Sequence, residues 1–323
     1  MLNRQVLILG AAGRLGRVLT LAFARAGWQT LAQLRREPPA EFAAQPGIRV
    51  VRADALDTAT LAAAAAGCSV VINALNAPYH RWDALALPLS RAAQGLALQL
   101  GALLMLPGNV YNFGHELPAR LLPDTPEVAN TAKARLRIQM EAELRDAPGL
   151  DSVVLRAGDF FGGPGRGSWF DQGLVSRWAA GKVVYPGDPN QAHAWAYLPD
   201  LARAFVAVAE QRAQLRGHRR LHFGGHTLTG CELAAALSAV RGAPLRLTGL
   251  PWGLIRLLAP VVPGWRAMLP MRYLWQRPHA LDGAALQAWV GPLPQTPLAE
   301  ALGEALASLG LQASLPKGSR PWA

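Results

Sequence analysis

Near the start of the chain, residues 6–16 read VLILGAAGRLG, and this stretch decides the fold. Four apolar residues predict a buried strand, and a glycine-rich turn leads from it into a helical pattern. Gly10 would let the chain turn sharply off the strand, Gly13 would let the backbone approach a pyrophosphate, and Gly16 would let the helix pack closely on the sheet. The amide groups that open the helix would then face the phosphates. We therefore predict a dinucleotide site that includes Gly10, Gly13, Arg14, Leu15 and Gly16.

Working outward from this stretch, the first half of the chain alternates apolar runs with Ala- and Leu-rich helical patterns. The predicted strands are Val6–Leu9, Gln29–Leu34, Ile48–Arg52, Val70–Ala74, Leu103–Leu106 and Ser152–Leu155. The predicted helices include Leu15–Ala26, Thr58–Ala66, Leu85–Leu100 and a helix from about Thr131 to Arg145. This alternation predicts an α/β protein with a Rossmann-type doubly wound parallel sheet.

Glycine and proline become frequent after Gly158, which favours a smaller and less regular C-terminal part that binds substrate. We therefore expect an NAD(P)-binding Rossmann domain over residues 1–160 and a mainly substrate-binding part over residues 161–323. Some segments of the second part, at about 195–225, are expected to return to the Rossmann domain.

The residues after the second predicted strand indicate which dinucleotide is bound. An NAD enzyme usually has Asp or Glu there to accept hydrogen bonds from the ribose hydroxyl groups. This chain has Arg35 and Arg36 instead, and guanidinium groups favour a 2′-phosphate through charge-assisted hydrogen bonds. Arg14 in the glycine turn would add a third positive group. The sequence therefore favours NADP(H) and leaves NAD(H) open, with a solvated basic turn as the alternative interpretation.

Composition limits the other classes of function. Of the 323 residues 51% are hydrophobic, which is enough for a large core and too many for a disordered chain. The two cysteines, Cys68 and Cys231, form neither a disulfide framework nor a metal-ligand cluster, so we expect no metal site and a cytoplasmic location. The net charge of +11 comes mostly from scattered arginines, which favours a small-molecule substrate over a nucleic-acid partner.

An apolar stretch over residues 245–262 is interrupted by Arg246, Pro251 and Arg256, so it is too short to span a bilayer. We interpret it as part of a substrate lid or of a subunit contact, which allows a homodimer. A segment at a membrane interface is the alternative.

Two further segments carry a family resemblance. Residues 52–57 read RADALD after the third predicted strand, and residues 71–76 read VINALN at the fourth. With the glycine turn, they resemble the extended short-chain dehydrogenase/reductase family, in particular its NAD(P)-dependent epimerase/dehydratase branch. The resemblance implies that Asp54 binds the adenine amine. The other residues implied to line the cofactor site are Ala55 beside Asp54, and Asn73, Ala74 and Leu75 near the nicotinamide.

The resemblance extends to later segments, where residues 156–162 read RAGDFFG and residues 195–202 read WAYLPDLA. Family members usually carry Ser, Tyr and Lys, with the last two in a Tyr-x-x-x-Lys arrangement. Lys133 matches the lysine, which holds the nicotinamide ribose. Ala129 stands at the tyrosine position and Pro107 at the serine position. The resemblance therefore implies a cofactor-binding role for Lys133 but not the usual proton relay.

Three residues are candidates to replace that relay. Asp159 follows a predicted strand at the ligand-binding edge of the sheet, where the aromatic residues 160–161 could favour its protonated form. Tyr111 could reach the pocket or be structural, and His80 could transfer protons or lie in a surface loop. The sequence thus predicts an NADP(H)-dependent oxidoreductase or epimerase/dehydratase-like enzyme for a small polar substrate, such as a carbonyl compound or a nucleotide-sugar. Its candidate catalytic residues are Lys133, Asp159 and Tyr111, and an inactive NADP(H)-binding sensor or regulator is the alternative.

Overall fold

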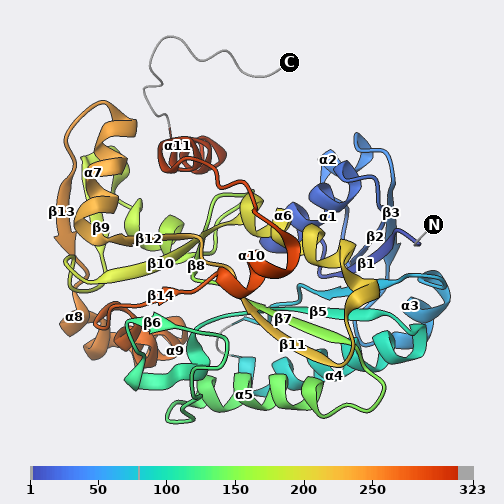
Figure 1. Cartoon of the computed structure of the whole chain (residues 1–323). Helices are drawn as coiled ribbons and strands as arrows, with labels where there is room; N and C mark the ends of the chain where they lie inside the picture. The colour runs from blue at the N-terminus through green and yellow to red at the C-terminus, as the bar shows by residue number, and fades with distance from the viewer. Residues whose placement is uncertain (1–2, 79–80, 312–323) are drawn as a thin grey trace.

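A seven-stranded parallel sheet forms the centre of the computed structural model, which describes residues 3–78 and 81–311 (Figure 1). Its strand order is β11-β7-β5-β4-β1-β2-β3, and every neighbouring pair is parallel. The chain order reverses at β1, which is the topological switch point of a Rossmann sheet. The predicted fold class is therefore confirmed.

The strands of this sheet are β1 (Gln5–Leu9), β2 (Gln29–Leu34), β3 (Ile48–Arg52), β4 (Val70–Asn73), β5 (Leu103–Gly108), β7 (Ser152–Arg156) and β11 (His218–His222). The six predicted strands agree with six of these to within two residues at each end, and β11 has no counterpart among them. One face carries α1 (Arg14–Arg25), α2 (Ala40–Ala43), α6 (Leu198–Glu210) and α10 (Ala284–Val290). The other carries α3 (Thr58–Ala64), α4 (Trp82–Leu100) and α5 (Ala132–Arg145).

Strand β1 shows why these segments form a covered sheet. Val6 and Ile8 pack into the core beneath α1 and α6, whereas Leu7 and Leu9 pack into the core above α4. All four side chains are fully buried. A parallel strand that is covered on both faces is apolar throughout, because successive side chains point to opposite faces.

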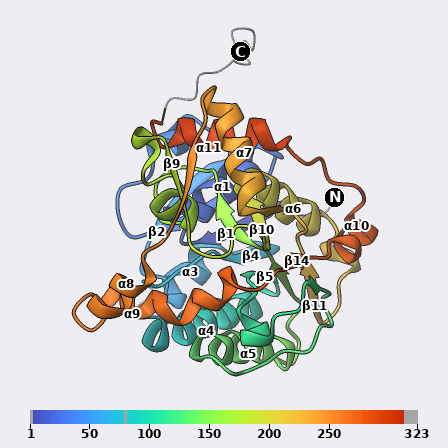
Figure 2. The same cartoon turned by 90° about the vertical axis from the view of Figure 1, so that its left-hand side faces the viewer.

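The rest of the chain builds three smaller sheets at one end of the molecule (Figures 1 and 2). In the first sheet, β10 (Ala192–Tyr197) lies between β12 (His226–Thr229) and β8 (Asp159–Phe161). The second sheet consists of β13 (Arg246–Gly249) and β9 (Lys182–Tyr185), and the third consists of β14 (Ala280–Leu281) and β6 (Arg120–Leu121). The remaining helices are α7 (Gly230–Arg241), α8 (Trp252–Leu258), α9 (Pro263–Met268) and α11 (Leu298–Ser308). The domain boundary near residue 160 stays a prediction.

The apolar stretch over residues 245–262 forms β13 and α8, and it exposes Leu254, Leu257 and Val261. Within residues 3–78 and 81–311, no helix is both long enough and apolar enough to cross a membrane.

Candidate functional site

The turn between β1 and α1 has the geometry that its glycines predict. Gly10 has a φ of 77°, in the left-handed region that favours glycine, and the amide of Gly13 donates a hydrogen bond of 2.9 Å to the Gly10 carbonyl. A Cβ atom on Gly16 would overlap that same carbonyl oxygen. Arg14 and Leu15 open helix α1 directly after the turn. The start of α1 therefore lies against backbone that has no side chains to block a phosphate group.

Backbone from the end of β4 lies against this turn. A Cβ atom on Gly10 would be 3.1 Å from the carbonyl oxygen of Ala74 and 3.2 Å from the Cα atom of Leu75. The amide of Ala74 donates to the Leu9 carbonyl at 3.1 Å, and the side chain of Asn73 accepts from the Leu75 amide at 3.3 Å. The structure thus brings three of the predicted cofactor residues, Asn73, Ala74 and Leu75, next to Gly10 at the switch point. This cradle fits a dinucleotide.

Gln33 supports the turn and is absent from the predicted site. Its side-chain oxygen accepts a hydrogen bond of 2.8 Å from the Gly10 amide, and its side-chain nitrogen donates one of 2.7 Å to the Ala53 carbonyl. Gln33 is buried in β2, so it ties the glycine turn to the end of β3. The signal in the sequence is a polar residue inside an otherwise apolar run.

The end of β2 carries Arg35 and Arg36, and both are exposed to solvent. The guanidinium of Arg35 is 3.8 Å from the carboxylate of Asp54. Asp54 also accepts a hydrogen bond of 2.9 Å from the Leu56 amide, and Ala55 between them is buried. Arg35 and Asp54 therefore meet at the edge of the sheet where the adenosine half of the dinucleotide is expected.

Arg14 differs from its expected role as a third positive group for the 2′-phosphate. Its guanidinium forms a two-pronged ion pair with the buried carboxylate of Asp171, with one of the two contacts at 2.9 Å. Its Nε atom also donates to the Gly162 carbonyl at 2.9 Å. The charge of Arg14 is thus neutralised within the protein, and the side chain ties α1 to the C-terminal part.

Lys133 lies in the first turn of α5, whose N-cap residue Thr131 accepts a hydrogen bond of 2.9 Å from the Ala134 amide. The Lys133 ammonium group is buried and lies 5.4 Å from the ring centroid of Trp82. Burial lowers the pKa of this ammonium group, and the negative charge of Asp83 partly opposes the effect. Lys133 thus combines a buried position with a positive charge, which suits a ligand-binding lysine.

Tyr111 belongs to the same group of side chains. It is buried, and its ring centroid is 6.0 Å from that of Trp82. The indole nitrogen of Trp82 donates hydrogen bonds of 2.9 Å to the Ala77 carbonyl and 3.2 Å to the side chain of Asn76. Trp82 begins α4 and contacts both Lys133 and Tyr111, so it holds this part of the site together. Trp82 is not among the site residues that the sequence predicts.

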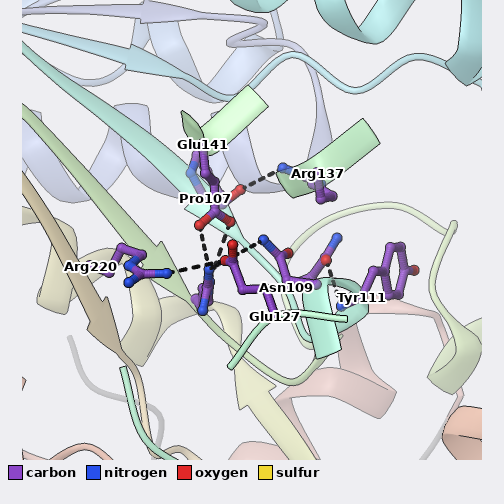
Figure 3. A network of polar contacts seen from close by, with 9 residues as sticks. Pro107, Asn109, Tyr111, Glu127, Arg137, Glu141 and Arg220 are labelled. Carbon is purple, nitrogen blue, oxygen red and sulfur yellow. Dashed lines mark hydrogen bonds and ion pairs between the residues drawn. The ribbon is translucent and has the colours of Figure 1, made fainter. Parts of the chain in front are cut away.

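A buried charge network lies behind the end of β5. Arg156 is fully buried and pairs with Glu141 at 2.5 Å and with Glu127, which also accepts from Arg220 at 3.2 Å (Figure 3). Two guanidinium groups and two carboxylates thus balance each other, with Arg156 and Glu141 buried and with Arg220 and Glu127 partly exposed. Such a network is strongly destabilised when one partner is removed, because a charge is then left buried and unpaired.

This network positions the loop after β5. Asn112 donates a hydrogen bond of 3.1 Å to the Glu127 carboxylate, and it lies in a short 3-10 helix over Tyr111–Glu116. Arg137 donates to the carbonyl oxygen of Pro107 at 3.2 Å, and the side chain of Asn109 accepts from the Tyr111 amide at 3.0 Å (Figure 3). The residues at the family's serine position and after it are therefore held by structural contacts.

Asp159 lies in a second group of side chains, at the start of β8. Its carboxylate oxygen is 2.8 Å from the Nε2 atom of His193, which is buried. The sequence predicts that residues 160–161 dry the surroundings of Asp159, but Phe161 packs against Phe170 and Tyr197. The polar partner of Asp159 is a histidine 34 positions later in the chain, which local sequence cannot indicate.

His80, the third candidate for proton transfer, lies outside the described residues. Among the residues that the structure describes, no group of three or more His, Cys, Asp or Glu side chains is arranged to hold a metal ion.

Comparison with known proteins agrees with this geometry. Residues 10–168 match a family model described as NAD(P)H-binding. The solved structure of MoeE5 in complex with UDP-glucose and NAD is similar, with 18% identity and a TM-score of 0.72 over 95% of this chain and 98% of that chain. The chain therefore has the same fold as this NAD-bound structure. This agrees with the family resemblance that the sequence indicates.

Other solved structures with this fold are similarly distant in sequence. A UDP-glucose-4-epimerase from Stenotrophomonas maltophila, with bound NAD and formylated UDP-arabinopyranose, is 17% identical with a TM-score of 0.75 over 94% of this chain and 97% of that chain. WbmH from Bordetella bronchiseptica, in complex with NAD+, is 18% identical with a TM-score of 0.73 over 95% of this chain and 98% of that chain. No curated protein sequence matches the chain significantly.

Proposed function

We propose that the protein is an NADP(H)-dependent oxidoreductase, or a related epimerase or dehydratase, that acts on a small substrate with a carbonyl or hydroxyl group. Its substrate class includes nucleotide-sugars, since two of the similar solved structures contain UDP-sugars. The observation that supports the proposal most directly is the position of Asp159. It follows β7 at the carboxyl edge of the sheet, the same edge that carries the glycine turn after β1 and the loop after β5.

Each proposed role follows from a contact. The glycine turn and the start of α1 would bind the pyrophosphate, and Lys133 would hold the nicotinamide ribose through hydrogen bonds from its ammonium group. A bound NAD(P)H would supply a hydride. Asp159 would give or take the proton at the substrate oxygen, which is the role that the family tyrosine usually has.

The preference for NADP(H) over NAD(H) rests on Arg35 and Arg36. They are the residues that directly follow β2, so no carboxylate occupies the positions that usually bind the 2′-hydroxyl. The next carboxylate, Glu37, is paired with Arg52 at 2.6 Å.

A screen of NADPH oxidation with carbonyl compounds and nucleotide-sugars tests the proposal. We expect at least one substrate to be turned over, and we expect Asp159→Asn to lower kcat about 100-fold or more while NADPH binding is nearly unchanged. The matched control is Asp188→Asn, which removes an exposed carboxylate outside the proposed site. A parent protein that binds NADPH and turns over no substrate would favour the inactive sensor or regulator instead.

A further inference from the structure

In the pair formed by Asp159 and His193, the imidazole is buried and the carboxylate is partly exposed to solvent. Trp195 is the register partner of Asp159 across β10 and β8, and His193 lies two residues earlier on the same face of β10. The side chain of His193 is 3% exposed, whereas that of Asp159 is 21% exposed. A small molecule can therefore reach the carboxylate but not the imidazole.

Aromatic side chains fix the orientation of the imidazole ring. The ring of His193 stacks on Trp275, with centroids 4.2 Å apart and planes 9° from parallel. Trp195 and His279 pack on it from other directions, with centroids at 4.9 Å and 4.5 Å. The ring can neither flip nor turn without disturbing this cluster, so its Nε2 atom stays directed at Asp159.

Three other titratable side chains that pack near the pair are uncharged near neutral pH, whereas the nearby carboxylate of Asp188 is exposed. From β9, Tyr185 has a pKa raised by burial and also by the Asp159 carboxylate. His279, which precedes β14, has a pKa lowered to about 3 by burial and by His193. From β12, His226 has a pKa lowered chiefly by burial. Tyr185, His279 and His226 therefore add no charge of their own beside the pair.

The strand that carries Asp159 is linked to the start of α1 through Arg14. Gly162 follows β8, and its carbonyl accepts the hydrogen bond from Arg14 at the start of α1. Three residues of extended strand separate Gly162 from Asp159, which corresponds to about 10 Å. A Cβ atom on Gly158 would overlap the Ala194 carbonyl, so β8 and β10 are held tightly together there. Asp159 is thus on a rigid element that is tied to the start of α1.

We propose that Asp159 and His193 form a proton-sharing pair that serves the oxygen of an uncharged hydroxyl or carbonyl group on the substrate. Asp159 contacts that oxygen, and His193 is the positioning residue. This inference rests on the proposed function and specifies its proton donor and the charge of the substrate at this subsite. An anionic phosphate or carboxylate is disfavoured there, because Asp159 is a carboxylate in one half of its proton cycle and would then repel the anion.

The proton balance of a reduction is then complete. Hydride from NAD(P)H adds to the carbonyl carbon, the C=O π bond opens, and the proton of Asp159 bonds to the substrate oxygen. The cofactor is oxidised, the substrate becomes an alcohol, and the proton that remains in the pair is shared between the Asp159 carboxylate and the Nε2 atom of His193. The carboxylate recovers a proton from solvent through its exposed side. Oxidation of an alcohol reverses each step.

The test compares His193→Gln with the parent. Glutamine can still donate a hydrogen bond to Asp159 but cannot exchange a proton at the pH of the assay. We expect kcat to fall at least 10-fold, one limb of the pH profile to move, and NADPH affinity to stay within 2-fold. The matched control is His279→Gln, which alters the same aromatic cluster without touching Asp159, and its pH profile should keep the shape of the parent profile. Melting temperatures and NADPH binding show that each variant is folded.

A second readout does not depend on turnover. The ring nitrogens of His193, observed by NMR between pH 5 and pH 9 in ¹⁵N-histidine-labelled protein, should change their pH response in Asp159→Asn and not in Asp188→Asn. The proposed pair would be overturned if the pH response of His193 were unchanged in Asp159→Asn. It would also be overturned if the pH profile of kcat were unchanged in His193→Gln. If the parent turned over no substrate while the NMR response changed as expected, the proposed function would fail although the pair is coupled.

Discussion

The guanidinium of Arg35 lies 3.8 Å from the carboxylate of Asp54, so the ends of β2 and β3 meet at the outer end of the cofactor site. The two side chains are 74% and 52% exposed. Ion pairs at such exposure contribute less than about 1 kcal/mol, because water screens both charges. Arg35 can therefore exchange Asp54 for a phosphate group at little cost.

This relationship predicts the effect of a charge reversal on cofactor preference. In Arg35→Asp, NADPH should bind about 10- to 100-fold more weakly, because a charge-assisted hydrogen bond is lost and a repulsion is gained. NADH affinity should be nearly unchanged, so the preference reverses. Calorimetric titration with both dinucleotides measures this, and Arg25→Asp at the far end of α1 is the control. An equal loss of affinity for NADPH and for NADH would show that Arg35 does not contact the 2′-phosphate.

Lys133 is predicted to bind the ribose of the nicotinamide. In Lys133→Met the loss of hydrogen bonds from a charged group should weaken NADPH binding by about 1.5–3 kcal/mol. Lys182→Met is the control, because that lysine lies on β9 in the C-terminal part. The prediction fails if both variants bind NADPH with the affinity of the parent.

Two glycine-to-alanine substitutions in helices should have opposite effects. In Gly16→Ala the added methyl group would overlap the Gly10 carbonyl, so we expect the free energy of unfolding to fall by about 1–3 kcal/mol and NADPH binding to weaken. Gly95 is exposed in α4 and has no heavy atom within 4 Å of an added Cβ atom, so Gly95→Ala should raise the free energy of unfolding by about 0.5–1 kcal/mol. Urea unfolding with and without NADPH measures both. A stable Gly16→Ala variant with normal affinity would show that α1 can move away from the turn.

Stability should fall in mild acid because of buried histidines. Burial, with a contribution from the charge of Arg156, lowers the pKa of His222 to about 4, and the ordinary histidine pKa in an unfolded chain is about 6.5. Between these values the unfolded chain binds more protons than the folded chain, so the free energy of unfolding decreases as pH falls from about 6.5 to about 4. The contribution of His222 is on the order of 3 kcal/mol.

Urea unfolding at several pH values checks this prediction. In His222→Asn the dependence on pH in this window should be shallower than in the parent, even if the variant is less stable at neutral pH. In His115→Asn, which changes an exposed histidine, the free energy of unfolding should depend on pH as steeply as it does in the parent. A parent stability that does not change between pH 6.5 and pH 4 would contradict the prediction.

The sequence by itself determined the Rossmann sheet and the glycine turn, because both depend on local properties. Apolar runs of strand length, separated by amphipathic helices, are stable only as a parallel sheet covered on both faces. A left-handed φ at Gly10 and a close approach at Gly16 need glycine at those positions whatever the rest of the chain does. The match of residues 10–168 to an NAD(P)H-binding family model agrees with what these residues predict.

Only the tertiary structure decided which side chains are partners. Arg14 pairs with Asp171 across 157 positions, and Asp159 meets His193 because β8 and β10 pair in one register. A shift of that register by one residue would turn His193 to the other face of the strand, so no local pattern encodes the contact. Packing of Trp275 on the imidazole then fixes the side chain that the backbone has placed. The cofactor turn is thus encoded locally, whereas the proposed proton-sharing pair exists only once the distant strands have assembled.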